Sequence, residues 1–99
     1  MIINQETLAT LLVMREKYPE NKAHTIAGDL LQLHTNLVPL LERWVKNQTD
    51  QDDYQYGGVS LKSLCDKLKM NYAAALVTMD WVIKAPDEAV PAIKSRFLV

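Results

Sequence analysis

The chain has 99 residues, of which 48% are hydrophobic, and a formal net charge of −1. This length is typical of one domain, and the hydrophobic content is enough for one core. No apolar run approaches the roughly 18–20 residues of a membrane span, and the N-terminus lacks the pattern of a signal peptide. The single cysteine, Cys65, excludes an internal disulfide. We therefore expect a cytoplasmic single-domain protein that binds no membrane.

Charge is unevenly distributed along the chain. Residues 1–56 carry 5 basic and 8 acidic side chains, whereas residues 57–99 carry 6 basic and 4 acidic ones. Proteins that bind nucleic acid without sequence preference usually have a clear excess of basic residues, because their affinity comes largely from neutralised phosphates. The overall balance argues against such a protein, although the C-terminal half is slightly basic.

The first predicted helix begins at an N-cap, Asn4, and ends at about Lys17. Its buried side is expected to contain Leu8, Leu11, Leu12 and the stem of Arg15. The helix ends at Tyr18 because Pro19 follows, and the residue before a proline is kept out of the α region.

The second predicted helix, residues 21–46, is the longest and carries two adjacent apolar stripes. They consist of Ile26, Leu30, Leu33, Leu37, Leu40 and Trp44, and of Ala27, Leu31, His34, Val38, Leu41 and Val45. Two stripes indicate a helix covered from two directions, by its own chain or by a second copy. Pro39 removes one helical hydrogen bond, so we expect a kink near residues 35–38 rather than a break. The predicted fold is an all-α bundle of four or five helices around this kinked helix, which Asn21 would cap.

Residues 47–58 are polar and end in two glycines, which predicts a loop. Tyr54 and Tyr56 stand beside an acidic run there, and they either suit a protein contact or fold back onto the core. No strand is predicted in the chain, and residues 87–99 lack the alternation and hairpin turn of a winged domain.

The C-terminal residues predict a short last helix instead. Asp87 would cap it, and Pro91 would be tolerated only in its first turn. Ile93, Phe97 and Leu98 would dock it on the core.

Residues 60–82, SLKSLCDKLKMNYAAALVTMDWV, are the most informative stretch. Apolar residues recur at helical spacing in both of its halves, namely Leu61, Leu64, Cys65 and Leu68, and then Ala75, Met79 and Val82. Asn71 can cap the second of the two helices. The layout resembles a helix-turn-helix unit, whose second helix lies in the DNA major groove. In such families a glycine often opens the turn, and here Lys69 stands at that position.

The resemblance implies a small transcriptional regulator of bacterial or phage type that binds double-stranded DNA as a homodimer. Its contacts to phosphates and bases would be Lys62, Lys67, Lys69, Asn71, Tyr72 and Ala73. The outward positions of the second helix would be Asn71, Tyr72, Ala73, Leu76, Val77 and Asp80. None of these is basic, and phosphate would repel Asp80.

The alternative is a small helical protein-interaction module, such as an adaptor, inhibitor or anti-regulator, that binds no nucleic acid. If Leu76 and Val77 face solvent, they suit a protein partner better than a DNA groove. Tyr54 and Tyr56 would add to that contact. The sequence leaves both interpretations open.

We expect no enzyme, no cofactor and no metal site. Cys65 lies among leucines at helical spacing, where a cysteine is usually an inert small hydrophobe. His24 and His34 have no pair of thiolates nearby for zinc. The acidic run Asp50, Asp52 and Asp53 resembles the start of a calcium loop, but Gln55 and Leu61 stand where that loop needs a glycine and a glutamate. No phosphate-binding glycine motif is present.

Overall fold

The computed structural model describes residues 3–48 and 54–97. Within these ranges the chain forms α1 (Gln5–Glu16), α2 (Glu20–Leu30), the 3-10 helix η1 (Thr35–Leu37), α3 (Val38–Val45), β1 (Gln55–Tyr56), β2 (Val59–Ser60), α4 (Leu61–Lys67), α5 (Tyr72–Lys84) and α6 (Pro86–Phe97). The mostly helical fold confirms the coarse prediction of an all-α protein. None of the described helices has the length and apolarity needed to cross a membrane. The acidic residues 50–53 and the predicted docking residue Leu98 lie outside the described ranges.

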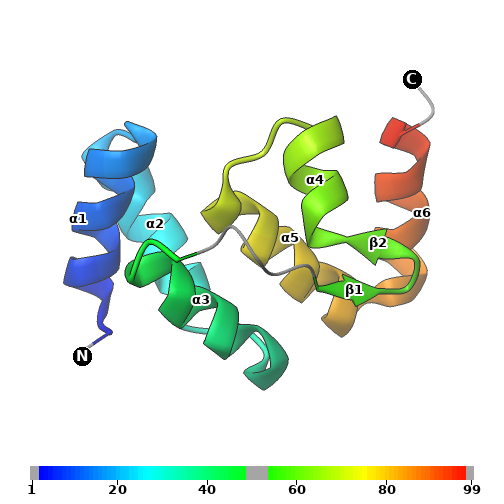
Figure 1. Ribbon diagram of the computed structural model, residues 1–99, viewed down its shortest axis with the longest axis horizontal. Coiled ribbons are helices and arrows are strands. Elements are labelled where there is room, and N and C mark those ends of the chain that lie inside the picture. The colour runs from blue at the N-terminus through cyan, green and yellow to red at the C-terminus, as the bar shows by residue number, and fades with distance from the viewer. Residues whose placement is uncertain (1–2, 49–53, 98–99) are drawn as a thin grey trace.

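Helix α5 lies at the centre of the molecule (Figure 1). It packs against α2 and α3 on one side and against α4, α6 and both strands on the other. Its buried side chains are Ala73, Ala75, Leu76, Met79 and Val82. A helix that is apolar around most of its circumference is stable only when neighbours cover it from several directions. The bundle is therefore built around α5, whereas residues 21–46 were predicted to have that role.

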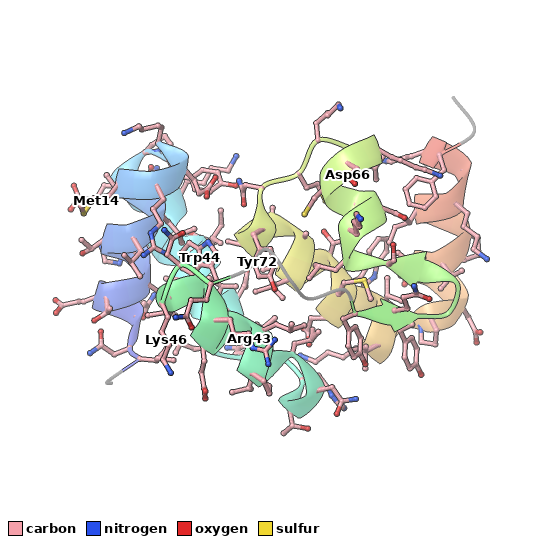
Figure 2. The ribbon with its side chains drawn as sticks, viewed as in Figure 1. Met14, Arg43, Trp44, Lys46, Asp66 and Tyr72 are labelled. Atoms are coloured by element: carbon pink, nitrogen blue, oxygen red, sulfur yellow. The ribbon has the colours of Figure 1, made fainter. Side chains whose placement is uncertain are left out.

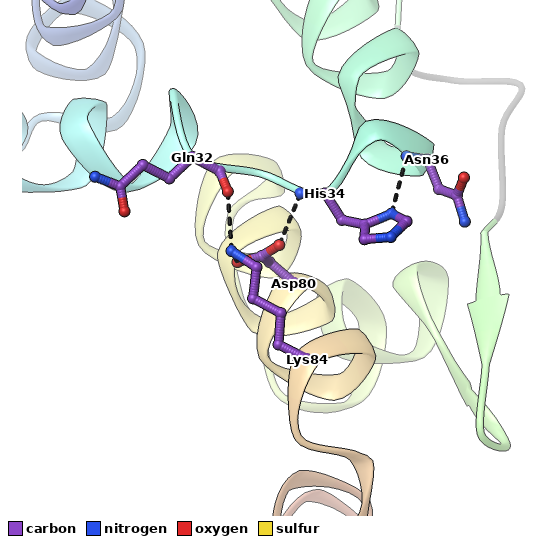
Figure 3. A network of polar contacts seen from close by, with 5 residues as sticks. All are labelled: Gln32, His34, Asn36, Asp80 and Lys84. Atoms are coloured by element: carbon purple, nitrogen blue, oxygen red, sulfur yellow. Dashed lines mark hydrogen bonds and ion pairs between the residues drawn. The ribbon is translucent and has the colours of Figure 1, made fainter.

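The predicted long, kinked second helix is wrong, because the chain breaks between α2 and η1. Pro39 lies in the first turn of α3, where its missing N–H would have no helical partner in any case. Two side chains of α5 bind backbone groups of the break (Figure 3). Asp80 accepts the N–H of His34 at 2.8 Å, and Lys84 donates to the carbonyl oxygen of Gln32 at 2.9 Å. The break thus avoids the cost of an interior proline and is stabilised by a distant helix.

A short β-hairpin occupies the end of the predicted loop, so the expectation of no strand is wrong. Tyr56 pairs with Val59 across the hairpin. Gly57 and Gly58 between them both have positive φ, which is the arrangement of a type I′ turn and is easily adopted only by residues such as glycine. The hairpin precedes α4, and the element that follows α5 is α6.

The predicted start of α1 is confirmed, whereas the predicted caps of α2 and α6 are not. The side chain of Asn4 accepts the N–H of Thr7 at 2.9 Å, as predicted for the start of α1. By contrast, α2 begins before Asn21 and α6 begins before Asp87, so neither residue is the predicted cap. Pro91 lies inside the twelve-residue α6 rather than in its first turn. That helix therefore continues past one position that has no N–H to donate.

Candidate functional site: the outward surface of the central helix

Helices α4 and α5 follow one another through a short turn, in the order that the helix-turn-helix resemblance predicts. The hydroxyl of Ser60 accepts the N–H of Ser63 at 3.0 Å at the start of α4. The side chain of Asn71 accepts the N–H of Ala74 at 2.8 Å at the start of α5, which confirms its predicted role as a cap. Lys69 has φ 58°, so the turn has the left-handed position where glycine is usual.

The predicted outward face of α5 is wrong at two positions. Ala73 and Leu76 have 0% of their surface exposed, because neighbouring helices cover α5 on both sides. Tyr72 is half-buried, and its hydroxyl oxygen is shielded from solvent. Ala73 is therefore not available to a thymine methyl group, nor Leu76 to a protein partner, while the chain is folded.

Asn71 uses both ends of its amide inside the protein. Its oxygen caps α5, and its nitrogen donates to the hydroxyl oxygen of Tyr18 at 2.7 Å. An adenine edge requires the same two groups of an asparagine. A base contact by Asn71 would therefore compete with two hydrogen bonds that hold the start of α5.

The three predicted phosphate-binding lysines, Lys62, Lys67 and Lys69, are exposed on α4 and on the turn. The ammonium of Lys67 lies 5.3 Å from the centre of the Phe97 ring, within the range of a cation–π contact. These three lysines thus lie around α4, and a fourth lysine beside the motif, Lys84, lies in the last turn of α5 and is paired with Asp80.

Several residues of α5 are at least partly reachable from solvent, and four of them form one narrow uncharged strip along the helix. It consists of Ala74, Val77, Thr78 and Trp81, and we call it the α5 strip. Trp81 is 38% exposed, and the hydroxyl of Thr78 is directed back to the carbonyl oxygen of Ala74 at 2.9 Å. The next exposed residue of α5, Lys84, is paired with Asp80 at 2.8 Å. The α5 strip itself is therefore uncharged and largely apolar, and the ion pair of Lys84 and Asp80 lies on the same helix near its C-terminal end.

Trp81 was not among the predicted contact residues. It lies one helical turn after Val77, which places both side chains on the same side of α5. Of the predicted partner contacts, Val77 keeps part of its surface and Tyr56 is exposed on β1. Tyr54 is half-buried, and its hydroxyl oxygen accepts a hydrogen bond from Asn36 at 3.3 Å.

The half-buried Tyr72 has a buried hydroxyl that is neutral. Its hydroxyl has no hydrogen-bond partner among the residues that the structure describes. Burial raises the pKa of Tyr72 above its usual value, the nearby Cys65 raises it further, and Arg43 lowers it. Figure 2 shows Tyr72 in the middle of the molecule, with Arg43 below it. A phenol in this position does not ionise near neutral pH.

The histidines have local roles. His24 is exposed on α2, and the ring of His34 accepts the N–H of Asn36 at 3.1 Å. Within residues 3–48 and 54–97, no three His, Cys, Asp or Glu side chains are grouped so as to hold a metal ion. Comparisons with protein-family models, with curated proteins and with solved structures return no match to this chain. The chemistry of its own surface is therefore the guide to what the chain can do.

Proposed function

We propose that this chain is a small helical protein-interaction module whose α5 strip contacts a protein partner. The observation that carries the proposal is the chemistry of the strip, which is uncharged and presents the exposed Trp81. Tryptophan is one of the residues that contribute most to the free energy of binding in protein interfaces. Direct reading of bases relies instead mostly on Arg, Lys, Asn and Gln. The strip therefore favours the second of the two functions that the sequence left open.

The surroundings of α5 support the same choice. A recognition helix projects from its domain so that one face can enter a major groove about 12 Å wide. Helix α5 is covered by α2 and α3 on one side and by α4, α6 and the hairpin on the other. Asp80 also holds the turn after α2 in place. A DNA groove could reach the covered face of α5 only if the core opened.

A second large apolar side chain lies near the C-terminal end of the strip. Leu31 is exposed just after α2, and the next residue, Gln32, accepts the hydrogen bond from Lys84 of α5. The backbone next to Leu31 thus lies close to the end of α5, where the Lys84 ammonium is located. An apolar centre with a charged rim is the usual composition of a protein interface.

The first test uses DNA, because helix-turn-helix binding stays a prediction of the sequence. A labelled mixed-sequence duplex is titrated with the protein at low salt and near physiological salt, and its fluorescence anisotropy is measured. We expect the duplex to show no salt-dependent binding to the protein at either salt concentration. Binding that weakens steeply with salt, and that Lys62→Ala and Lys69→Ala reduce, would establish a phosphate-contacting surface instead.

The second test concerns the partner. The wild-type protein and two variants are immobilised, and the proteins that each retains are compared by quantitative mass spectrometry. The variants are Trp81→Glu and a control, Ala92→Glu, which adds the same charge at an exposed position of α6. We expect a partner that wild type and the control retain and that Trp81→Glu loses. Circular dichroism checks that all three chains are folded. If Trp81→Glu retains the same proteins as the control, the α5 strip is not the interface. Light scattering of the same samples tests the predicted homodimer.

A further inference from the structure

Helix α1 carries a second apolar surface, at the end of the molecule opposite the hairpin (Figure 1). A helix at the edge of a domain usually has apolar residues only on the face that the domain covers. The covered face of α1 contains Leu8, Ala9 and Leu12. The helix also presents Val13 and Met14 outward, and Met14 is 64% exposed. Figure 2 shows Met14 at the outer edge of the molecule. None of the described residues covers these two side chains in the way that the core covers Leu8 and Leu12.

The surface is hollowed between α1 and α2. A cavity of about 390 Å³ is lined by Glu6, Ala9, Thr10, Val13, Met14, Glu20 and His24. A second depression, of about 340 Å³, is lined by Glu6, Thr7, Thr10 and Leu11. The two depressions share Glu6 and Thr10. We call the larger cavity the α1–α2 groove.

The rim of the α1–α2 groove is acidic. Glu6 and Glu20 are both exposed and both line it, and none of the described residues lining it is a lysine or arginine. Two nearby lysines make contacts of their own. Lys17 donates to the carbonyl oxygen of Met14 at 3.1 Å, and Lys22 lies 5.5 Å from the centre of the Tyr18 ring. Among the residues that line the groove, the carboxylates of Glu6 and Glu20 are the acidic groups, and His24 lies beside them.

We propose that the α1–α2 groove binds a cationic amphipathic helix of a partner protein. Large apolar side chains of that helix would pack on Val13 and Met14, while its lysines or arginines would face Glu6 and Glu20. Helix-in-groove recognition uses apolar anchors at helical spacing, and complementary charge selects the partner. Methionine suits such a floor because its flexible, polarizable side chain adapts to different anchors. This surface is separate from the α5 strip and gives the module a second partner of different chemistry.

The test uses two labelled helical peptides with the same pattern of leucines. One carries lysines on its polar face and the other glutamates, and each is titrated with the full chain near physiological salt while anisotropy is recorded. We expect the lysine peptide to bind and the glutamate peptide not to bind. Met14→Ser, which removes the apolar contact without adding a charge that would attract the lysine peptide, should weaken binding of that peptide about tenfold or more, as expected for an anchor contact. The control Met14→Leu should bind like wild type.

Two further variants separate this surface from the α5 strip. The double variant Glu6→Gln and Glu20→Gln should weaken binding of the lysine peptide, whereas Trp81→Glu should leave it unchanged. Amide chemical shifts should change in residues 6–24 when the lysine peptide is added. Failure of the lysine peptide to bind, equal binding of both peptides, or shift changes confined to α4–α6 would overturn the proposal without affecting the α5 strip. Circular dichroism shows whether Met14→Ser is folded, and Met14→Gln serves as a second uncharged variant with the same expected loss.

Discussion

Helices α5 and α1 differ in how their apolar residues are covered. Helix α5 was predicted to project Ala73 and Leu76 into solvent, and it is instead the central helix with both side chains buried. Helix α1 was predicted to have one buried side, and it lies at the edge with a second apolar side that exposes Met14. The apolar residues of a helix thus indicate how much of its surface needs cover. They do not indicate whether the same chain or a partner supplies that cover.

The largest expected effect is a difference in the free energy of unfolding between side-chain truncations on these two helices. Leu76→Ala should lower the free energy of unfolding by about 2–5 kcal/mol, because it leaves a cavity in a fully covered site. Met14→Ala should change it by no more than about 0.5 kcal/mol, as is usual for exposed positions. Urea denaturation of both variants measures the two values. Equal losses would contradict the different positions assigned to the two helices.

Asp80 should contribute to stability through the break between α2 and η1. Asp80→Ala leaves the N–H of His34 without its partner, which should cost about 1–3 kcal/mol. Asp80→Asn keeps an oxygen that can accept this hydrogen bond. It loses only the ion pair with Lys84, whose side chain is 51% exposed, and pairs in solvent contribute little. Thermal unfolding compares the variants. If Asp80→Asn is as unstable as Asp80→Ala, the ion pair rather than the backbone hydrogen bond holds the break.

Because of Tyr72, we expect the stability of the protein to fall at high pH. Because its pKa is raised in the folded chain, the unfolded chain ionises first, above about pH 10. The contribution of Tyr72 to stability is therefore present below that pH and is lost as the pH rises through the folded-state pKa. Tyr72→Phe should make this decline shallower. At neutral pH it should leave stability unchanged or raise it by up to about 1 kcal/mol, since the hydroxyl has no partner within residues 3–48 and 54–97.

Chemical denaturation near neutral pH and at high pH tests this prediction. The same decline in wild type and Tyr72→Phe would show that Tyr72 does not titrate differently in the folded chain. A substantial loss of stability at neutral pH would show that its hydroxyl has a partner.

The smallest effect is expected at the turn before α5. Lys69→Gly should raise the free energy of unfolding by about 0.5–1 kcal/mol, because glycine adopts a positive φ without strain. The matched control is Lys67→Gly, which places glycine in the last turn of α4 and should lower stability by up to about 1 kcal/mol. Calorimetry of the two variants gives the sign of each change. A loss of stability in Lys69→Gly would contradict the left-handed conformation of this residue.

The sequence predicted features whose causes are local. Asn4 and Asn71 each cap a helix by a hydrogen bond to the residue three positions on, so the pattern is visible in a few letters. The break after α2 was missed because the groups that stabilise it, Asp80 and Lys84, are 46 and 52 residues away from their partners. The hairpin was missed although Gly57 and Gly58 signalled it, since strands of two residues carry no alternation.

The accessible surface of α5 could not be predicted for a different reason. The apolar spacing placed a helix correctly at residues 72–82, but the helix-turn-helix pattern assigned its outward face in advance. That assignment put Leu76 outside and did not consider Trp81. The other helices determine which side of an almost wholly apolar helix stays exposed to solvent. The apolar pattern of a single sequence does not predict where those helices pack. Val77 was the one predicted contact on α5 that stayed on the α5 strip.

Native-state hydrogen exchange of the backbone amides tests the central claim most directly, which is that α5 is the covered centre of the fold. We predict that the slowest-exchanging amides lie at residues 75–79, with an opening free energy close to that of global unfolding. Amides in the outer part of α1 should exchange through smaller openings. If the amides of α5 exchanged as fast as those of α1, α5 would be a peripheral helix with an accessible face. That result would contradict the central position of α5, and the DNA-binding interpretation would regain its structural basis.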